Sequence, residues 1–333
     1  MSRREHANIA LFVAHVGCPQ RCTFCNQNVI TGAPQTAQPG DVAEAVRTAL
    51  ASGTRGAQLA FFGGSFTAVD RNYMVSLLEA ARPFVEDGSV SGIRCSTRPD
   101  AIDESVLELL KKYNVEAVEL GAQSMDDRVL AMNRRGHTED DVRRASALIH
   151  SFGMELGLQM MTGLYGDTDE GAMRTADELI SLQPATVRIY PTVVLEGTEL
   201  ARLYAAGTYR PQTLPEAVSL CAALLPKFTD NGIRVIRLGL HSGGNVEDGY
   251  LAGAYHPAFR ELVEGELYLQ KVEELMKGLP EGEYTLYVKP SEISKITGQK
   301  RKNILKLKEH GYDCKVKGNA ELEPFEVIAA VNK

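Results

Sequence analysis

The chain has no apolar run near the ~20 residues that a transmembrane helix requires, and no signal-peptide pattern precedes its first strand-like segment. Cysteine is scarce, with six residues in 333; three are clustered and three are scattered, which does not suggest a disulfide framework. These absences predict a cytoplasmic protein in a reducing compartment, with no membrane partner. The remaining composition, 44% hydrophobic and 24% charged, is typical of a globular chain, and 333 residues suggest one large domain and a small one, or two domains.

The net charge of −7 hides an excess of basic residues late in the sequence. Residues 284–318 contain nine Lys or Arg residues and three Asp or Glu residues. Such a basic patch favours RNA as a partner, because contacts to phosphates supply much of the affinity for nucleic acid. A solvated helix face rich in lysine has the same composition, so both interpretations stay open.

Three of the six cysteines, Cys18, Cys22 and Cys25, lie within eight residues, directly after a strand-like run at residues 9–16. A cubane iron–sulfur cluster is ordinarily held by four thiolates, so three cysteines leave one iron open to a ligand that is not protein. Open coordination is where metal catalysis takes place. The spacing therefore predicts a [4Fe–4S] cluster with one free iron.

Two other interpretations of the cysteines stay open. A structural zinc site could use the same three thiols with His15 or His6, since three cysteines and one histidine are a common zinc set. Such sites usually staple small modules through paired Cys-x2-Cys knuckles, whereas here a single loop opens a long chain. Reactive or incidental thiols are the third interpretation.

Strand-like and helix-like segments alternate along the first half of the chain. The expected strands are at residues 8–16, 57–62, 92–96, 115–120, 155–161 and 186–191. The expected helices are at residues 41–51, 72–84, 104–113, 139–152 and 170–182. Strict alternation predicts parallel strands covered by helices, in an α/β barrel or a doubly wound sheet. Candidate functional residues fall at the carboxyl ends of successive strands, which favours a barrel.

Glycine and polar residues at these strand ends form the candidate site. Paired glycines let backbone approach a ligand closely, although most such pairs are turns. An arginine offers a planar fork of donors that suits a carboxylate. A tyrosine could relay a radical or donate hydrogen, although a buried tyrosine more often has a satisfied hydroxyl. The candidates are Gly63, Gly64 and Ser65 after the second strand, Arg98 after the third, Gln123, Ser124 and Arg135 after the fourth, Gln159 on the fifth and Tyr190 on the sixth.

Together these motifs resemble those of the radical S-adenosylmethionine (SAM) superfamily. The cysteine triad, with Phe24 directly before its last member, is similar to the loop whose open iron binds the amino and carboxylate groups of SAM in that family. The resemblance implies that the backbone near the paired glycines, and Gln123 and Arg135, contact SAM, and that Gln159 contacts its ribose. Phe24, Arg98 and Ser124 complete the predicted cofactor site.

Residues 118–138 are similar to the radical SAM core of the Elongator catalytic subunit, which modifies wobble uridines in tRNA, and more loosely to oxygen-independent coproporphyrinogen III oxidase. The resemblance implies a partial (β/α)6 barrel over residues 1–240 and a small α/β appendage over residues 241–333. Within the appendage, residues 291–318 are expected to form a helix, a glycine break, a basic helix and a strand. The implied chemistry is reductive cleavage of SAM to a 5′-deoxyadenosyl radical, with an electron donor such as flavodoxin or ferredoxin.

The expected substrate is a nucleotide in tRNA or another RNA, which the Elongator resemblance and the basic segment both favour. A small molecule or a tetrapyrrole is the alternative that the oxidase resemblance supports. A non-catalytic iron–sulfur or haem carrier with the same fold is a third. The 333 residues leave no room for the acetyltransferase domain of Elongator, so we do not expect its wobble-uridine chemistry to carry over.

Overall fold

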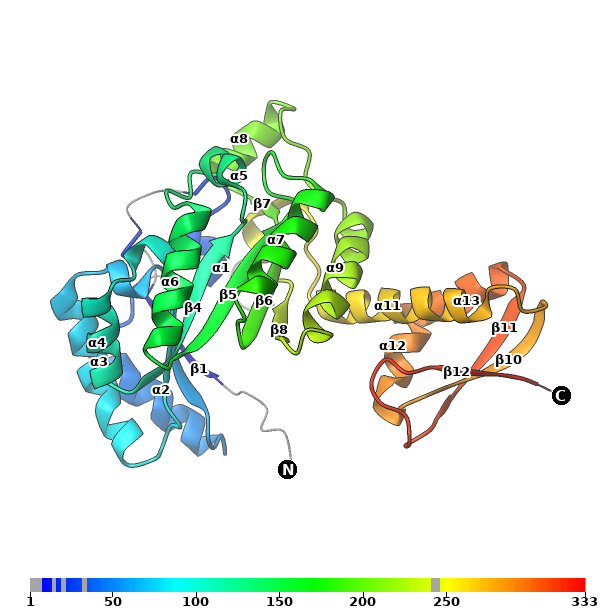
Figure 1. Ribbon diagram of the computed structural model, residues 1–333, viewed down its shortest axis with the longest axis horizontal. Helices are drawn as coiled ribbons and strands as arrows, with labels where there is room; N and C mark the ends of the chain where they lie inside the picture. Colours follow the sequence, from blue (N-terminus) through cyan, green and yellow to red (C-terminus); the bar gives the residue numbers. More distant parts are fainter. Residues whose placement is uncertain (1–7, 14–15, 19–21, 32–34, 241–245, 333) are drawn as a thin grey trace. The chain divides into compact units, whose positions relative to one another are not determined.

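The computed structural model describes residues 8–13, 16–18, 22–31, 35–240 and 246–332. The chain divides into two compact units (Figure 1). The first unit comprises residues 1–212 and 227–255, and the second comprises residues 213–226 and 256–333. The division falls within helix α9 (Leu214–Thr229).

The first unit is built on a curled sheet of seven parallel strands in the order β1-β2-β3-β4-β5-β6-β8 (Figure 1). Each strand pairs in parallel with the next one in this order. Because neighbouring strands point the same way, their carboxyl ends meet at one edge of the sheet. The strands are β1 (Asn8–Val13), β2 (Gln58–Gly63), β3 (Ile93–Thr97), β4 (Val115–Gln123), β5 (Glu155–Thr162), β6 (Thr186–Pro191) and β8 (Arg234–Leu238).

Helices from the strand connections cover one face of this sheet (Figure 1). They are α2 (Pro39–Ala51), α3 (Arg71–Glu86), α4 (Glu104–Lys112), α6 (Glu139–Ser151) and α7 (Asp169–Ser181), with the short α5 (Asp127–Met132) before α6. Each of the larger helices buries one apolar stripe, as α3 does with Met74, Leu77, Leu78 and Ala81. Side chains cap several of their N-termini by accepting hydrogen bonds from first-turn N–H groups; these caps are Asp70, Asp103, Thr138 and Thr168.

The remaining elements of the first unit are short. They are α1 (Gln27–Thr31), the 3-10 turns Phe66–Ala68 and Pro99–Ala101, β7 (Val193–Leu195), α8 (Glu199–Ala205), α10 (Val246–Gly249) and β9 (Tyr250–Gly253). Strands β7 and β9 pair antiparallel and form a separate two-stranded sheet. In the part of the chain that the structure describes, no helix combines the length and apolar character needed to cross a membrane.

The second unit packs helices against a three-stranded sheet in the order β11-β10-β12. Its elements are α11 (Phe259–Met276), β10 (Gly282–Val288), α12 (Ile293–Thr297), α13 (Lys302–Glu309), β11 (Tyr312–Gly318) and β12 (Ile328–Val331), with 3-10 turns at Pro290–Glu292 and Gln299–Arg301. Strand β10 runs parallel to β11 and antiparallel to β12. An apolar core that includes Tyr268, Leu286 and Leu307 joins the helices to the sheet.

The expected α/β class and barrel-type sheet are confirmed. All six expected strands and all five expected helices are present, with ends displaced by a few residues. The sheet has a seventh strand, β8, that the sequence analysis did not predict. In the second unit, α12, Gly298, α13 and β11 match the expected order of helix, glycine break, basic helix and strand.

Candidate functional site

The cysteine loop follows β1, and Asn133 at the C-terminal end of α5 holds it in place. The N–H of Thr23 donates to the carbonyl of Asn133 (3.2 Å), and the Thr23 hydroxyl donates to Asn133 Oδ1 (2.9 Å). The N–H of Cys25 donates to the carbonyl of Cys22 (3.1 Å), which closes a turn between these two cysteines. Asn133 is fully buried, and the sequence analysis assigned it no role.

The three thiols lie close enough to affect one another electrostatically. Burial, and then the charges of Cys22 and Cys18, raise the pKa of Cys25 to about 12. Burial and the charge of Cys22 also raise the pKa of Cys18. The guanidinium of Arg135 opposes both shifts, and its Nη1 donates to Cys22 Sγ at 3.1 Å. Metal ligation needs thiolates, but the charge of Arg135 alone does not lower the pKa values of Cys18 and Cys25 to their ordinary range. A bound cationic centre would stabilise the thiolates, and the three sulfurs are therefore a reasonable ligand set for a cluster.

The described residues hold no preformed site for a single metal ion. Among the described residues, no three His, Cys, Asp or Glu side chains are grouped closely enough to hold one ion. A cubane is larger than an ion, and its thiolate ligands bind separate iron atoms. The histidines of the zinc alternative, His6 and His15, lie outside the described residues, as do residues 19–21 of the loop.

The paired glycines bring the end of β2 against the backbone that follows β1. Gly63 has a φ of +104°, a conformation that glycine adopts readily and other residues rarely do. A Cβ on Gly64 would lie 2.4 Å from the carbonyl oxygen of Val16 and 2.5 Å from that of Val13. Only glycine therefore permits the backbone at Gly64 to approach the backbone at Val13 and Val16 so closely. This contact lies directly before the cysteine loop.

Ser65 and Arg98 connect the ends of β2 and β3. The Ser65 hydroxyl lies 2.8 Å from Thr97 Oγ1 and accepts a hydrogen bond from the Arg98 N–H (3.1 Å). The guanidinium of Arg98 donates to both carboxylate oxygens of Asp100, through Nε (2.9 Å) and Nη2 (2.6 Å). Its third nitrogen, Nη1, is buried and has no partner within the described part of the chain. Arg98 thus has one guanidinium nitrogen left for a ligand.

Strand β4 ends in a strained residue. Gln123 has a φ of +68°, rare for a residue other than glycine, and its buried Oε1 has no partner among the residues described. Arg135 donates through Nη2 to the carbonyl of Gly121 (2.6 Å), while its buried Nε has no such partner either. Buried polar atoms are normally paired, so these orphaned atoms indicate a ligand site. Ser124 is buried beside it and accepts from the N–H of Asp126 (3.2 Å).

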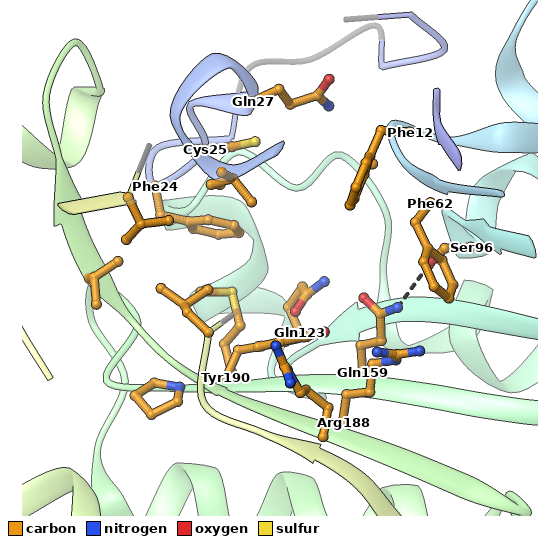
Figure 2. A pocket seen from close by; sticks show the side chains of 18 of the residues that line it. Phe12, Phe24, Cys25, Gln27, Phe62, Ser96, Gln123, Gln159, Arg188 and Tyr190 are labelled. Carbon is orange, nitrogen blue, oxygen red and sulfur yellow. Dashed lines mark hydrogen bonds between the residues drawn. The ribbon is translucent and has the colours of Figure 1, made fainter. Parts of the chain in front are cut away.

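A cavity of about 590 Å³ lies in the first unit (Figure 2). All seven strands of the main sheet contribute residues that line it. This volume is typical of a small-molecule or cofactor site. Cys25 and Gln27 lie on one side of the cavity, and Gln159 and Arg188 lie on the opposite side (Figure 2). Of the predicted site residues, those that line it are Phe24, Cys25, Gly63, Gln123, Gln159 and Tyr190.

A buried carboxylate, Glu119 on β4, organises the polar side of the cavity. It accepts hydrogen bonds from Arg188 Nε (2.6 Å) and Nη2 (2.8 Å), from Arg94 Nη1 (3.2 Å) and from Gln159 Nε2 (3.0 Å). Burial by itself raises the pKa of Glu119, but the charges of Arg188 and Arg94 outweigh it, so the pKa is lowered overall. Glu119 is therefore ionised and holds Arg188 and Gln159 in fixed positions.

Arg188 and Arg237 occupy paired positions on β6 and β8, and both line the cavity. The Arg188 guanidinium also lies over the ring of Phe62, 4.8 Å from its centroid. Arg237 has no hydrogen-bond or ion-pair partner among the residues that the structure describes. The roles of Glu119, Arg94 and Arg237 were not predicted from the sequence. For Glu119 and Arg94 the available signal was a charged residue on a strand that is otherwise buried, since such a charge is almost always paired when buried.

Alanine at Gly157 is expected to destabilise the first unit by about 1–3 kcal/mol, because overpacking forces pinned neighbours to move. A Cβ there would lie 2.8 Å from Glu119 Cγ and 3.0 Å from Thr186 Oγ1. Urea unfolding followed by circular dichroism measures the change. Gly40→Ala in α2 is the matched control, since its Cβ meets no atom within 4 Å and should add up to about 1 kcal/mol of stability. An equal change in unfolding free energy in the two variants would contradict close packing of the Glu119 side chain against Gly157.

The family model of the radical SAM superfamily matches residues 13–179, which is half of the chain. The chain belongs to the radical SAM superfamily. A second model, that of the radical SAM C-terminal domain, matches residues 184–268 of this radical SAM enzyme.

Two curated relatives and one solved structure show the range of similarity of this radical SAM enzyme. A tRNA uridine(34) acetyltransferase of Methanocaldococcus jannaschii is 28% identical over 194 residues, covering 51% of this chain and 36% of that protein. Protein YhcC of Escherichia coli K12 is 24% identical over 221 residues, covering 62% of this chain and 71% of YhcC. The structure of Elp3 from Methanocaldococcus infernus with an N-terminal deletion has a TM-score of 0.61 at 20% identity, covering 82% of this chain and 63% of that one.

The structural similarity, at this identity, supports the radical SAM fold alone. The chain spans 26% to 56% of the length of the tRNA uridine(34) acetyltransferases that it matches.

Proposed function

We propose that this enzyme holds a [4Fe–4S] cluster through Cys18, Cys22 and Cys25, binds SAM beside it, and modifies a nucleotide in RNA. The observation that carries the proposal is that Cys25 shares one cavity with the polar ends of β4, β5 and β6. When bound, the cluster supplies the electron that cleaves SAM to methionine and a 5′-deoxyadenosyl radical. A flavodoxin or ferredoxin is the proposed electron donor.

The unused polar atoms near the cysteine loop match the amino-acid end of SAM. Oε1 of Gln123 is an acceptor suited to an ammonium group, whereas Nε of Arg135 and Nη1 of Arg98 are donors suited to a carboxylate. We assign these three side chains to SAM, together with the backbone at Gly63. Gly64, Ser65 and Ser124 are assigned to the same site as residues that hold the neighbouring backbone in position.

The ribose and the adenine of SAM are assigned to the cavity itself. Gln159 is held by Ser96 Oγ (2.7 Å) and by Glu119, so its amide is fixed in a position to meet ribose hydroxyls. Phe24 and Tyr190 pack against the buried cluster that contains Met161, on the apolar side of the cavity, and this keeps water away from a reactive radical. The protein's part is thus to orient SAM and the substrate and to exclude water.

Tyr190 is proposed as a hydrogen donor or radical relay. Its side chain lines the cavity, and burial raises its pKa, so the hydroxyl keeps its proton at neutral pH. Tyr190→Phe is expected to lower the yield of modified substrate by about 100-fold, the low end of the range for positioned proton-transfer groups. It should leave the rate of 5′-deoxyadenosine formation unchanged.

The matched control for Tyr190 is Tyr209→Phe. The Tyr209 hydroxyl donates to the carbonyl of Gly163 (2.7 Å), and Tyr209 is not among the residues lining the cavity. Product formation is measured by mass spectrometry of the substrate after a fixed number of SAM turnovers. Normal product from Tyr190→Phe would show that another group donates the hydrogen.

RNA is proposed as the substrate on two grounds. Relatives that match this chain bear the name tRNA uridine(34) acetyltransferase. The second unit carries the basic segment at residues 284–318, and phosphate contacts by such segments provide affinity for RNA.

A small anionic molecule is the second candidate substrate, because Arg188 and Arg237 both line the cavity. Arginine binds carboxylates and phosphates through paired donors, and a tetrapyrrole with carboxylate side chains would also present such groups. A nucleotide presents a phosphate instead, so only a direct test separates the two candidates.

The test uses anaerobically reconstituted enzyme with reduced flavodoxin, and mass spectrometry of 5′-deoxyadenosine. Total tRNA and a tRNA-free metabolite extract are added in parallel, and nucleosides from a deletion strain are compared with those from wild type. Stimulation by tRNA together with a missing modified nucleoside supports the proposal. Stimulation by the extract alone favours the second candidate. Absence of 5′-deoxyadenosine under every condition would overturn the proposed chemistry.

A further inference from the structure

The basic residues of the second unit are not equally available to a ligand. Five of the nine in residues 284–318 have an acidic partner; they are Lys289, Lys295, Lys306, Lys308 and Lys315. Of the other four, three are consecutive: Lys300, Arg301 and Lys302. Their side chains are exposed and have no hydrogen-bond or ion-pair partner in the described part of the chain. The uncompensated positive charge of the segment is therefore concentrated at one short loop.

This loop joins α12 to α13 and has an unusual backbone. Gly298, Lys300 and Arg301 have φ values of +73°, +51° and +63°. Lysine and arginine rarely adopt such values, and each costs stability unless the surroundings enforce it. Strain of this kind concentrates at binding and catalytic sites.

The loop is held rigidly from below. Asn303 is buried and donates through Nδ2 to the carbonyls of Gly265 (2.8 Å) and Ile296 (3.1 Å). A Cβ on Gly298 would lie 2.9 Å from Asn303 Cγ, so the glycine allows the loop to pack on this anchor. The N–H of Arg301 donates to the carbonyl of Gly298 (3.0 Å), which closes the turn. The three cationic side chains are thus presented by a loop that needs little ordering on binding.

The surrounding elements follow the order strand, helix, loop, helix, strand, as β10, α12, the loop, α13 and β11, with β10 and β11 parallel. KH modules use a Gly-x-x-Gly loop between two helices to clamp the backbone of about four nucleotides. Here Gly298 and Arg301 stand at the two ends of the same four-residue spacing. Arg301 adopts the left-handed conformation that a second glycine would adopt, and it adds a guanidinium suited to a phosphate.

We propose that residues 298–302 bind the sugar-phosphate backbone of single-stranded RNA and so recruit the RNA substrate. This inference rests on the proposed function for the choice of RNA as the polyanion. The guanidinium of Arg301 would hold the phosphates, while Lys300 and Lys302 add electrostatic attraction.

The experiment measures fluorescence anisotropy of a short labelled single-stranded RNA with the full-length reconstituted enzyme at several salt concentrations. The loop variant is Lys300→Gln, Arg301→Gln and Lys302→Gln combined. It should bind at least about 10-fold more weakly, because charge-assisted hydrogen bonds are lost. The slope of log affinity against log salt should fall by about 2, since each phosphate contact to a single strand contributes about 0.7.

The matched control combines Lys289→Gln, Lys308→Gln and Lys315→Gln, which removes the same charge from lysines that have acidic partners. It should keep the salt slope of the wild type. Equal losses in the two triple variants, no loss in the loop variant, or no RNA binding by the wild type would each overturn the inference.

Arg301→Gly separates the conformation of the loop from its charge. Glycine adopts a φ of +63° without strain, so the thermal unfolding midpoint should be retained or raised. The salt slope should fall by about 0.7, the value of one contact. An unchanged slope would remove Arg301 from the site. RNA binding needs no SAM cleavage, so loss of either property in the wild type identifies which of the two proposals has failed.

Discussion

Alanine in place of Cys22 is expected to leave the reconstituted enzyme without the proposed [4Fe–4S] cluster and without SAM cleavage. Cys22 is the buried member of the trio, it forms a turn with Cys25, and Arg135 donates to its sulfur. Loss of partners outside the first ligand shell already lowers metal affinity by 10–100-fold, so loss of a ligand should exceed about 100-fold. Iron and sulfide content and the visible absorbance of the cluster report the loss independently of activity.

Cys314→Ala is the matched control for Cys22→Ala. Cys314 is a buried cysteine on β11 in the second unit, so the chemical change is the same at a position outside the cysteine loop. Its iron content and its SAM cleavage should equal those of the wild type. Full iron in Cys22→Ala would remove this residue from the ligand set. Zinc bound stoichiometrically to anaerobically purified wild type would favour the zinc alternative instead.

The strands from β2 to β6 could be predicted from the sequence because their signals are local. Parallel strands buried on both faces are short apolar runs, and the helices between them carry capping residues such as Asp103 and Thr138. The same holds for α12, the break at Gly298 and α13 in the second unit. The cysteine spacing is equally local, which is why the candidate cluster loop was found without a structure.

Strand β8 (Arg234–Leu238) could not be predicted in the same way. Two of its five residues are arginines, so it lacks the apolar run of the other strands, and its strand conformation depends on pairing with β6. The left-handed backbone of Gln123 likewise coincides with an irregular register between β4 and β5. Both features arise from tertiary pairing, which overrides local propensity.

The charged network around Glu119 shows the same limit at the candidate site. The sequence places Arg94, Glu119 and Arg188 on three different strands, but nothing in their spacing says that one carboxylate contacts both arginines. Contact with Arg188 requires the Glu119 side chain to pass over β5, and Gly157 leaves the room for it. The interaction therefore depends on the order of the strands and on one missing side chain.

Glu119→Gln is expected to destabilise the first unit by about 3–5 kcal/mol at neutral pH, because removing one partner of a buried ion pair leaves an uncompensated charge. Arg94 would retain its contact with Glu155 (2.6 Å), but Arg188 would lose the carboxylate that it contacts through two nitrogens. Urea unfolding of the cluster-free protein, followed by circular dichroism, measures the change. Glu116→Gln, at an exposed position on the same strand, should change stability by no more than about 0.5 kcal/mol.

The pH dependence tests whether the charge of Glu119 is responsible. The pKa of Glu119 in the folded state is lowered from its ordinary value of 4.5, so the unfolded state binds the proton more readily. The stabilisation is therefore complete above pH 4.5 and is lost as the pH falls through the lower, folded-state pKa. The stability difference between wild type and Glu119→Gln should be constant from pH 6 to pH 8 and should shrink below pH 4.5. A stability difference that persists unchanged in acid would mean that Glu119 stabilises the fold by its packing and not by its charge. Arg188 would then be held in the cavity by contacts other than this ion pair.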